Sequence, residues 1–140
     1  MNYYSKIGLI GTGFVGGQVK KWFKGCAWYS KSGGSFEKVD SKEFIFLCLP
    51  TPFKKSTGFD LSILTENIKK LSDGKKIIIK STVLPNTTKV LQTMYPQHDF
   101  FFNPEFLVEK TAKKDFFEPE RQIVGYVGDS RRTKRIEEIY

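Results

Sequence analysis

The sequence has few of the residues that build disulfide frameworks or metal clusters. Its 140 residues include two cysteines, Cys26 and Cys48, and one histidine, His98. Two cysteines form neither a disulfide framework nor a metal-binding cluster, so we expect a chain that folds in a reducing, cytosolic setting. Both cysteines fall in or at expected buried strands, where a thiol usually behaves as an inert small hydrophobe. We expect His98 to be plain surface.

Long apolar segments are also missing. No apolar run approaches the ~18 residues that a membrane-spanning helix needs. Met1 is followed almost at once by a strand-like run rather than by a secretory signal. We therefore expect no membrane association and a cytoplasmic location. The length fits one domain whose core is large enough to fold alone.

Acidic residues are fewer than basic ones. The 23 Lys and Arg against 15 Asp and Glu give a net charge of +8, which attracts anionic partners such as nucleotides, sugar nucleotides and nucleic acids. The basic residues are dispersed in pairs along the chain, which is typical of solvated surface. A nucleic-acid groove would need exposed aromatic residues interleaved along one face. A small anionic ligand is therefore the favoured partner, and nucleic acid is not.

Short apolar runs alternate with amphipathic segments along the whole chain. We expect strands at residues 6–10, 26–29, 44–49, 76–80, 99–102 and 122–127, and helices at 18–23, 61–71, 85–94 and from 129 or 130 to 140. Residues 105–113 are expected to be loop or short helix. This alternation predicts a three-layer α/β fold with a doubly wound, Rossmann-like parallel sheet in a single domain. Open sheets of this kind bind ligands at the carboxyl ends of their strands.

A glycine-rich turn follows the first expected strand. Gly11-Thr12-Gly13-Phe14-Val15-Gly16 has G-x-G-x-x-G spacing between a strand and a helix. In this pattern the first glycine permits the tight turn, the second admits a pyrophosphate and the third allows close helix–strand packing. The alternative is a strand–turn–helix with incidental glycines. The context favours a dinucleotide site.

The end of the second expected strand departs from the usual NAD pattern. An acidic residue normally stands there and bonds the ribose hydroxyls. This chain has Ser30, Lys31 and Ser32 instead, and the nearest acid is Glu37. A Ser-Lys-Ser cluster could receive a 2′-phosphate, which would favour NADP. The alternative is a plain polar turn, so NAD and NADP both remain open.

Three further motifs carry a family resemblance. Asn103-Pro104-Glu105-Phe106-Leu107, Cys48-Leu49-Pro50-Thr51-Pro52 and Lys80-Ser81-Thr82-Val83 stand behind the glycine-rich turn in the expected order. Together they resemble the UDP-glucose/GDP-mannose 6-dehydrogenase family. The resemblance covers nearly the whole chain and only the first, NAD-binding domain of the family.

The resemblance implies oxidation of a sugar C6 alcohol to an acid, with nicotinamide cofactor reduced. It places Glu105 near the reacting carbon as a general base or a holder of water, and Thr82 as a group that orients that water. It assigns cofactor contacts to Pro50, Thr51 and Thr82, and a second acid near the nicotinamide to Glu109. Taken alone, Glu105 could equally be a carboxylate that caps a helix N-terminus.

The sequence departs from the family in two places. Lys110 stands where the family has Gly beside Glu109, and the second crossover is trimmed to about 14 residues before Phe44. Arg121 matches a family Arg.

The family's thioester-forming cysteine and its sugar-binding residues belong to later domains, which residues 1–140 do not include. We therefore expect the NAD(P)-binding domain of a nucleotide-sugar 6-dehydrogenase, incomplete for catalysis alone. A UDP-sugar would bind only with a further domain or a partner chain. The alternative is a non-catalytic nucleotide-binding module of the same fold. Phe116, Phe117 and Tyr140 are expected to be exposed where another domain would pack, and self-association could follow through them.

Overall fold

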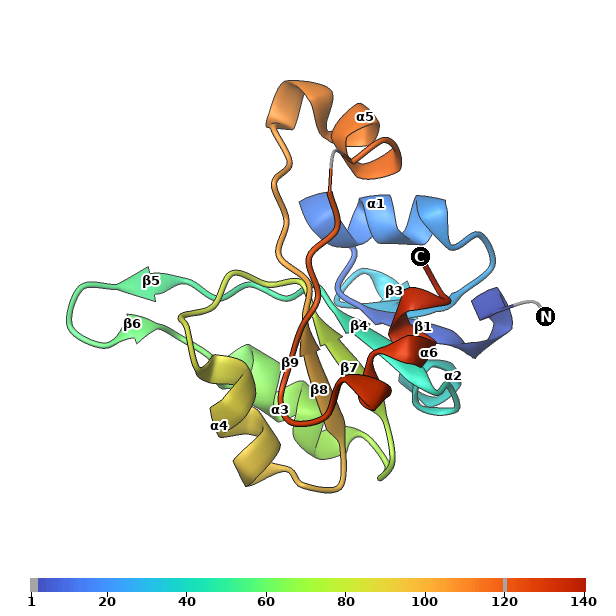
Figure 1. Ribbon diagram of the computed structural model, residues 1–140. Coiled ribbons are helices and arrows are strands. Elements are labelled where there is room, and N and C mark those ends of the chain that lie inside the picture. The colour runs from blue at the N-terminus through green and yellow to red at the C-terminus, as the bar shows by residue number, and fades with distance from the viewer. Residues whose placement is uncertain (1–2, 120) are drawn as a thin grey trace.

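A central sheet organises the computed structural model, which describes residues 3–119 and 121–140. The described residues form a seven-stranded sheet in the order β3-β2-β1-β4-β7-β8-β9. The strands are β1 (Ile7–Ile10), β2 (Ala27–Ser30), β3 (Gly33–Gly34), β4 (Phe44–Leu47), β7 (Lys76–Ile79), β8 (Asp99–Phe102) and β9 (Gly125–Tyr126). The five strands from β2 to β8 are mutually parallel, and the two edge strands pair antiparallel. A separate antiparallel hairpin, β5 (Phe53–Lys54) with β6 (Gly58–Phe59), projects from the body (Figure 1).

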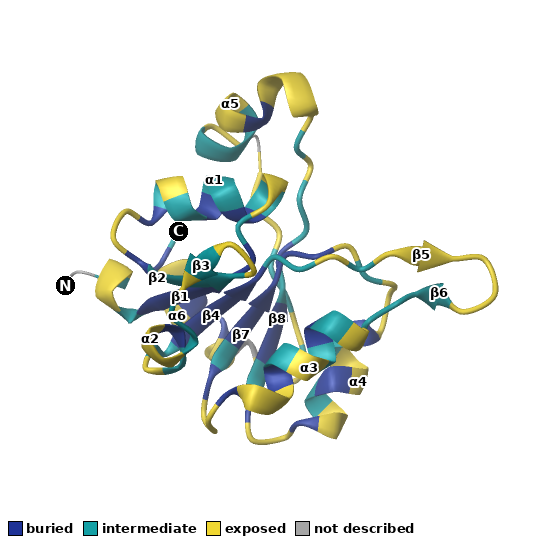
Figure 2. Ribbon diagram, turned by 180° about the vertical axis from the view of Figure 1, so that it is seen from behind, coloured by how far each residue is buried: buried dark blue, intermediate teal, exposed yellow. Residues whose placement is uncertain are grey.

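Alternating side chains divide the core between the two faces of the sheet. In β4, Ile45 and Leu47 face one hydrophobic cluster, and Phe44 and Phe46 face the other. Successive residues of a strand point to opposite faces, so a strand covered on both sides is apolar throughout. All four residues of β4 are fully buried, as Figure 2 shows for the middle of the sheet. The continuous apolar run of the sequence is thereby explained.

Helices cover both faces. The first cluster packs under α2 (Phe36–Asp40), α3 (Ser62–Lys70) and α4 (Thr87–Met94), and the second under α1 (Phe14–Trp22) and α6 (Lys134–Glu137). A further helix, α5 (Ala112–Phe117), lies beside α1, and three 3-10 turns are η1 (Tyr3–Lys6), η2 (Glu109–Thr111) and η3 (Ser130–Arg132). This confirms the predicted three-layer, doubly wound α/β fold. None of the helices in the described part of the chain combines the length and apolar character needed to cross a bilayer.

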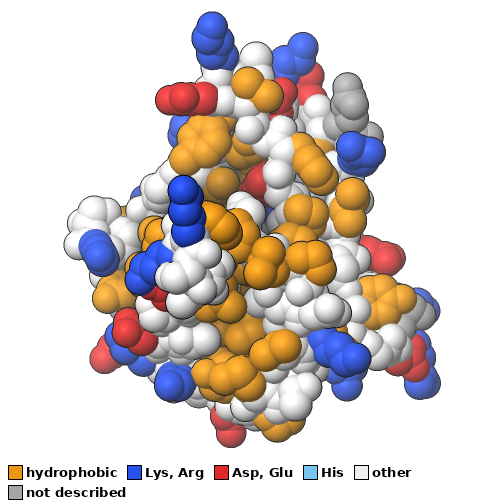
Figure 3. Space-filling model, turned by 90° about the vertical axis from the view of Figure 1, so that its left-hand side faces the viewer, with side chains coloured by type: hydrophobic (Ala, Val, Ile, Leu, Met, Phe, Trp, Pro, Cys, Tyr) orange, Lys and Arg blue, Asp and Glu red, His pale blue; other side chains and the backbone are white. Residues whose placement is uncertain are grey.

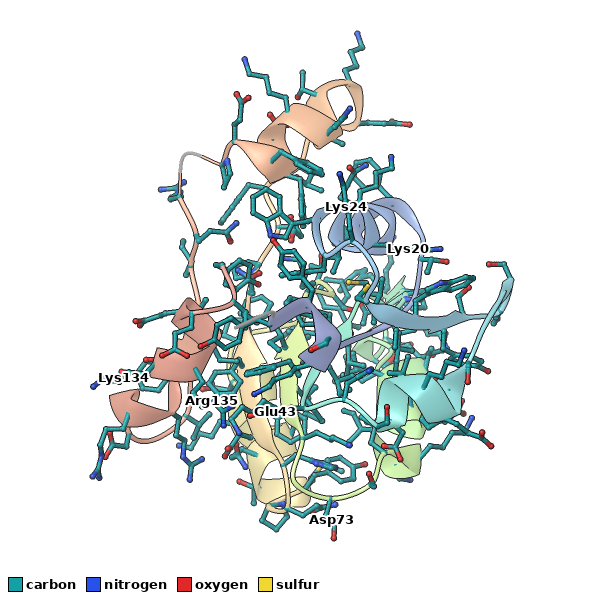
Figure 4. The ribbon with its side chains drawn as sticks, turned by 90° about the vertical axis from the view of Figure 1, so that its right-hand side faces the viewer. Lys20, Lys24, Glu43, Asp73, Lys134 and Arg135 are labelled. Carbon is teal, nitrogen blue, oxygen red and sulfur yellow. The ribbon has the colours of Figure 1, made fainter. Side chains whose placement is uncertain are left out.

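Ion pairs and a hydrogen bond hold the C-terminal segment at the amino ends of the strands. Arg135 binds Glu43, with Nη1 at 2.8 Å and Nη2 at 3.0 Å from the two carboxylate oxygens, and the two side chains lie together in Figure 4. Lys76 also contacts Glu43, at 3.5 Å. The Tyr3 hydroxyl donates to Glu138 at 2.9 Å. Residues from both ends of the chain therefore meet at the amino ends of the strands.

Several expected elements differ in extent or direction. Residues 122–127 were expected to form a strand, and only Gly125–Tyr126 do so, antiparallel to β8. The first helix begins at Phe14 rather than after the glycine-rich turn. The helix expected from Pro85 begins at Thr87, and the last helix is divided into η3 and the short α6. The trimmed crossover still holds β3 and the five-residue α2. The β5–β6 hairpin has no counterpart in the sequence-based prediction.

The prediction that His98 is plain surface is wrong. His98 is 2% exposed and its Nδ1 accepts a hydrogen bond from the Lys75 backbone N–H at 3.3 Å. Its ring lies edge-on to Phe100. Burial lowers the pKa of His98, so the imidazole is held in its neutral form. His98 thus closes the amino end of the sheet between β7 and β8.

Phe116, Phe117 and Tyr140 are not the exposed aromatic surface that the sequence suggested. Phe116 and Phe117 are half-buried and pack edge-to-face on Trp22 of α1, with ring centroids 6.4 and 5.2 Å away. Tyr140 packs on Phe46, and burial raises the pKa of its hydroxyl well above the ordinary value. These rings are occupied within the chain. Self-association therefore stays a prediction, and these three aromatic rings do not support it.

Close packing of α1 on the sheet makes a test of the fold possible. A Cβ at Gly16 would collide with the Gly11 carbonyl, whereas a Cβ at Gly17 would meet nothing nearer than 3.7 Å. We predict that Gly16→Ala lowers the free energy of unfolding by about 2 kcal/mol or more, because the backbone has to shift. Gly17→Ala, the matched control, should raise it by about 0.5–1 kcal/mol through helix propensity. Urea denaturation measures both, and equal stability of the two variants would contradict this packing.

Candidate functional site

A crevice of about 880 Å³ opens at the carboxyl ends of the parallel strands. It lies where the chain order reverses, because β1 has β2 on one side and β4 on the other. Such a switch point leaves a gap between crossovers that run in opposite directions, and it is where open α/β sheets bind ligands. The volume falls in the range of roughly 300–1,000 Å³ found for small-molecule sites. Figure 3 looks at the side on which the β5–β6 hairpin projects, and hydrophobic side chains gather across the middle of that face.

The glycine-rich turn forms the floor of the crevice. Gly11 has φ +96° and its N–H donates to the Tyr29 carbonyl at 2.9 Å. A Cβ at Gly11 would collide with the carbonyl of Cys48. Together with the close approach of Gly16, this lets β1, α1 and the end of β4 come into backbone contact. Gly16 acts through this packing and does not line the crevice.

Gly13 presents open space to the crevice. An added Cβ there would meet no atom within 4 Å, and the Gly13 backbone has φ −71° and ψ −148°. Gly13 is the N-cap of α1, and no side chain caps that helix end. The first N–H groups of the nine-residue helix are therefore available to an anion, and the helix dipole favours one. This cradle fits the pyrophosphate of a dinucleotide.

Three hydroxyl groups meet at the end of β2. The Thr12 hydroxyl donates to Ser30 Oγ at 3.0 Å, and the Ser30 and Ser32 hydroxyls are 2.8 Å apart. The Ser32 backbone N–H also donates to Ser30 Oγ, at 3.2 Å. Lys31 is exposed between the two serines and lines the crevice. This cluster joins the glycine-rich turn to the second strand.

The loops after β4 and β7 are braced against each other. The Ser81 hydroxyl donates to the Leu49 carbonyl at 2.7 Å and accepts from the Leu49 N–H at 3.0 Å. The Thr51 hydroxyl donates to the Thr82 carbonyl at 2.6 Å. Pro50, Thr51 and Thr82 all line the crevice. The side chain of Thr82 is exposed on the crevice wall, where it is available to a ligand.

A buried lysine holds Glu105 at the far wall. Lys80 is 4% exposed, and its ammonium forms an ion pair with the Glu105 carboxylate and donates to Asn103 Oδ1 at 2.5 Å. The Tyr140 hydroxyl donates to the same Asn103 oxygen. Asn103 in turn donates through Nδ2 to the Ile123 carbonyl at 2.9 Å. A buried charge must be paired to be tolerated, and this network provides the partners.

Cys48 lines the crevice next to this network without being a reactive thiol. Burial raises the pKa of the Cys48 thiol to about 12; the Lys80 charge works in the opposite direction and Glu105 in the same one. The thiolate is the nucleophilic form of cysteine, so Cys48 stays a protonated, inert group near neutral pH. Burial also raises the pKa of Cys26, which lies away from the crevice. Both cysteines were predicted to be inert, and their environments agree.

The structure brings together most of the residues that the sequence singled out. The crevice is lined by Gly11, Thr12, Gly13, Phe14, Val15, Ser30, Lys31, Pro50, Thr51, Thr82 and Glu105. Glu109 does not line it and is exposed in η2, because the segment after Glu105 leads away from the sheet. Arg121 lies with its guanidinium 5.3 Å from the Phe106 ring centre and lines a second cavity of about 270 Å³. Glu105 lies between the two, because it lines both cavities.

Sequence reasoning missed two parts of the crevice. One is the α3 wall, to which Glu66, Asn67 and Lys70 belong. Glu66 and Lys70 are one helical turn apart, but this spacing did not indicate a ligand. The other is the Lys80–Asn103–Tyr140 network behind Glu105. Lys80 and Asn103 were seen as parts of motifs, but their pairing joins residues of different strands.

Comparisons with known proteins agree with this architecture. Residues 29–140 match the UDP-glucose/GDP-mannose dehydrogenase family, NAD binding domain. The chain is 37% identical over 97 residues to a UDP-glucose 6-dehydrogenase of Rickettsia bellii, covering 64% of the chain and 22% of the relative. It is 31% identical over 112 residues to a GDP-mannose 6-dehydrogenase of Pseudomonas aeruginosa, covering 68% of the chain and 26% of the relative. The chain therefore spans about a quarter of the length of each.

A solved structure shows the same fold. The crystal structure of a ternary complex of GDP-mannose dehydrogenase from Pseudomonas aeruginosa superposes with a TM-score of 0.78 at 20% identity, covering 96% of this chain and 44% of that one. The switch-point crevice, the glycine-rich turn and the family match agree on a nicotinamide dinucleotide as the cofactor class. The chain belongs to the UDP-glucose/GDP-mannose dehydrogenase family, as its NAD-binding domain.

Proposed function

We propose that the crevice binds NAD or NADP across the switch point, with the pyrophosphate on the turn of residues 11–16. The observation that carries this proposal is the open space at Gly13 in front of the uncapped N-terminus of α1. A side chain at residue 13 would fill that space, and a capping side chain would compete for the free N–H groups. The net charge of +8 assists the capture of an anion.

The two ends of the dinucleotide follow from the topology. The β2 side of the switch point holds Thr12, Ser30 and Lys31, so we place the adenosine ribose there. The β4 and β7 side holds Thr51, Thr82 and Glu105, and we place the nicotinamide there. The hydrogen bonds of Thr51 and Ser81 keep the two loops of this half at a fixed separation. Glu109 is not included in this cofactor site.

We further propose that the chain serves a nucleotide-sugar 6-dehydrogenase in which Glu105 acts on the alcohol or on water. A bound nicotinamide would supply the hydride acceptor. The Glu105 carboxylate lines both the crevice and the cavity beside it, so it can accept a proton from a hydroxyl group placed between them. The exposed Thr82 hydroxyl on the neighbouring loop can orient the same group.

The thiolate for the second oxidation step would come from outside residues 1–140. Cys48 faces the crevice, but its pKa of about 12 keeps it protonated. We therefore propose that this chain provides the dinucleotide and the carboxylate, and that further domains or a partner chain supply the thiol and the sugar-nucleotide contacts. Residues 1–140 would form the dinucleotide-binding domain of such an assembly.

Lys80 prepares Glu105 for this role. Its buried ammonium forms an ion pair with the Glu105 carboxylate and is itself held by Asn103, which is tied to residue 123. An ionised carboxylate is the form that accepts a proton. Glu105 also lines the crevice, and its side chain is 15% exposed, so a ligand can reach it while Lys80 holds it. Lys80 therefore positions Glu105, and Glu105 remains the group that acts on the alcohol or on water.

Substitution of Gly13 tests the binding site directly. We predict that Gly13→Val abolishes binding of NAD and NADP in calorimetric titration, because the side chain occupies the pyrophosphate space. Its Cβ meets no protein atom within 4 Å, so urea denaturation should show a chain that still folds cooperatively. Gly17→Ala, one turn into α1 and clear of the crevice, should bind as the parent does. Unchanged affinity of the Gly13 variant would show that the turn is not the site.

A double-mutant cycle tests the buried pair. We predict that Lys80→Met lowers the free energy of unfolding by about 3–5 kcal/mol, because it leaves the Glu105 charge without a partner. The combined Lys80→Met, Glu105→Gln variant should lose less free energy of unfolding than Lys80→Met alone, because it contains no unpaired Glu105 charge. Urea denaturation measures each corner of the cycle. Lys54→Met, which removes an exposed ion pair with Asp60, is the control and should change little. Additive losses would contradict a coupled pair.

A further inference from the structure

The turn between β2 and β3 is a rigid two-residue loop at the adenosine end of the crevice. β2 and β3 pair antiparallel, with Ser30 opposite Gly33 and Tyr29 opposite Gly34. Lys31 and Ser32 are therefore the two central residues of a tight hairpin. The Gly33 and Gly34 backbones take positive φ values of 145° and 83°. A loop of this length has few alternative conformations, so Lys31 and Ser32 are held in place before a ligand arrives.

The hydroxyl groups of this loop are already directed to one point. Ser30 Oγ is the centre, within hydrogen-bond distance of Thr12 Oγ1, Ser32 Oγ and the Ser32 N–H. Hydroxyl groups can rotate and donate to an incoming anion without moving their oxygen atoms. The cluster is therefore a set of prearranged donors beside the place where the adenosine ribose would lie.

Lysines outnumber acidic residues among the described lining residues of the crevice. Lys31 lines the crevice from the hairpin, Lys70 lines it from α3, and Lys80 follows β7. Two acids are among the described lining residues: Glu66 lies on α3, and Glu105 lies at the nicotinamide end, paired with Lys80. Ser30 occupies the strand-end position where a carboxylate would bond both ribose hydroxyls and repel a phosphate. With serine there, that repulsion is removed and a lysine stands next to it.

We propose that this crevice prefers a dinucleotide phosphorylated on the adenosine 2′-oxygen, NADP, and that Ser30, Lys31 and Ser32 hold the 2′-phosphate. The inference rests on the proposed function, because it requires the dinucleotide to lie across the switch point with its adenosine over β2. Lys31 supplies the charge, and the two serine hydroxyls supply hydrogen bonds. Hydrogen bonds to a charged group are the strong ones in proteins.

Calorimetric titration of the 140-residue chain with NAD and with NADP tests the preference. We expect NADP to bind at least about tenfold more tightly, since hydrogen bonds to a charged group contribute about 1.5–3 kcal/mol each. Adenosine 2′,5′-bisphosphate should exceed adenosine 5′-monophosphate in affinity by a similar factor, because the two ligands differ only in the 2′-phosphate. NAD binding as tightly as NADP, or more tightly, would overturn this inference and leave the proposed function intact. Absence of binding by both dinucleotides would overturn both.

Three variants show whether the named residues carry the preference. Lys31→Ala should weaken NADP about tenfold and leave NAD unchanged. Ser30→Asp should reverse the preference, because a carboxylate accepts from the ribose hydroxyls and repels the phosphate. Lys55→Ala removes the same charge from the exposed β5–β6 hairpin outside the crevice and should leave the NADP to NAD ratio nearly unchanged.

Equal losses of NADP affinity in Lys31→Ala and Lys55→Ala would mean that the net charge of the chain accounts for the preference. That result would overturn the assignment. Circular dichroism confirms that each variant is folded. Ser32→Ala, a smaller change at an exposed position, provides a second reading if Ser30→Asp unfolds. It should weaken NADP and spare NAD, and equal weakening of both would count against the site.

Discussion

The parallel register of the sheet is the constraint on which the rest of the structure depends. Hydrogen bonds continue past the strand ends in the same direction, from Gly11 N–H to the Tyr29 carbonyl, from Cys48 to Ile10, from Lys80 to Leu47 and from Asn103 to Ile79. Each bond places the first residue after one strand beside the end of its neighbour. Chemically useful residues that are far apart in sequence therefore stand in one row. A slip of one residue in any strand would turn its side chains to the other face.

Two groups of residues use this row in different ways. At the β1–β4 switch point, small residues allow backbones to touch, and the space left at Gly13 becomes the cradle for an anion. At the β7 and β8 ends, a buried charge is accepted because three polar partners reach it or its neighbours: Glu105, Asn103 and Tyr140. Tyr140 belongs to the segment that returns across the second face of the sheet. The candidate acid–base group is thus held by the same packing that completes the core.

The sequence was sufficient for the fold class and for most of the crevice, because both depend on local signals. Alternating apolar runs reveal strands covered on both faces, and strand-end motifs reveal what stands at one edge. It was not sufficient for His98, whose ring accepts a hydrogen bond from the backbone of Lys75, 23 positions earlier, just before β7. The packing of Phe116 and Phe117 on Trp22 likewise joins residues nearly a hundred positions apart. The motif suggested a role for Glu109, yet the turn after Glu105 takes it away from the crevice.

The central claim is that one crevice at the carboxyl ends of the strands holds the dinucleotide. Titration of the ¹⁵N-labelled chain with NADP, followed by amide chemical shifts, tests it most directly. The account predicts shifts at residues 11–15, 30–32 and 81–82 and at Glu105. It predicts little change around Lys75 and His98, which lie at the amino ends of the strands. Shifts confined to the amino ends of the strands, or to the β5–β6 hairpin, would contradict it.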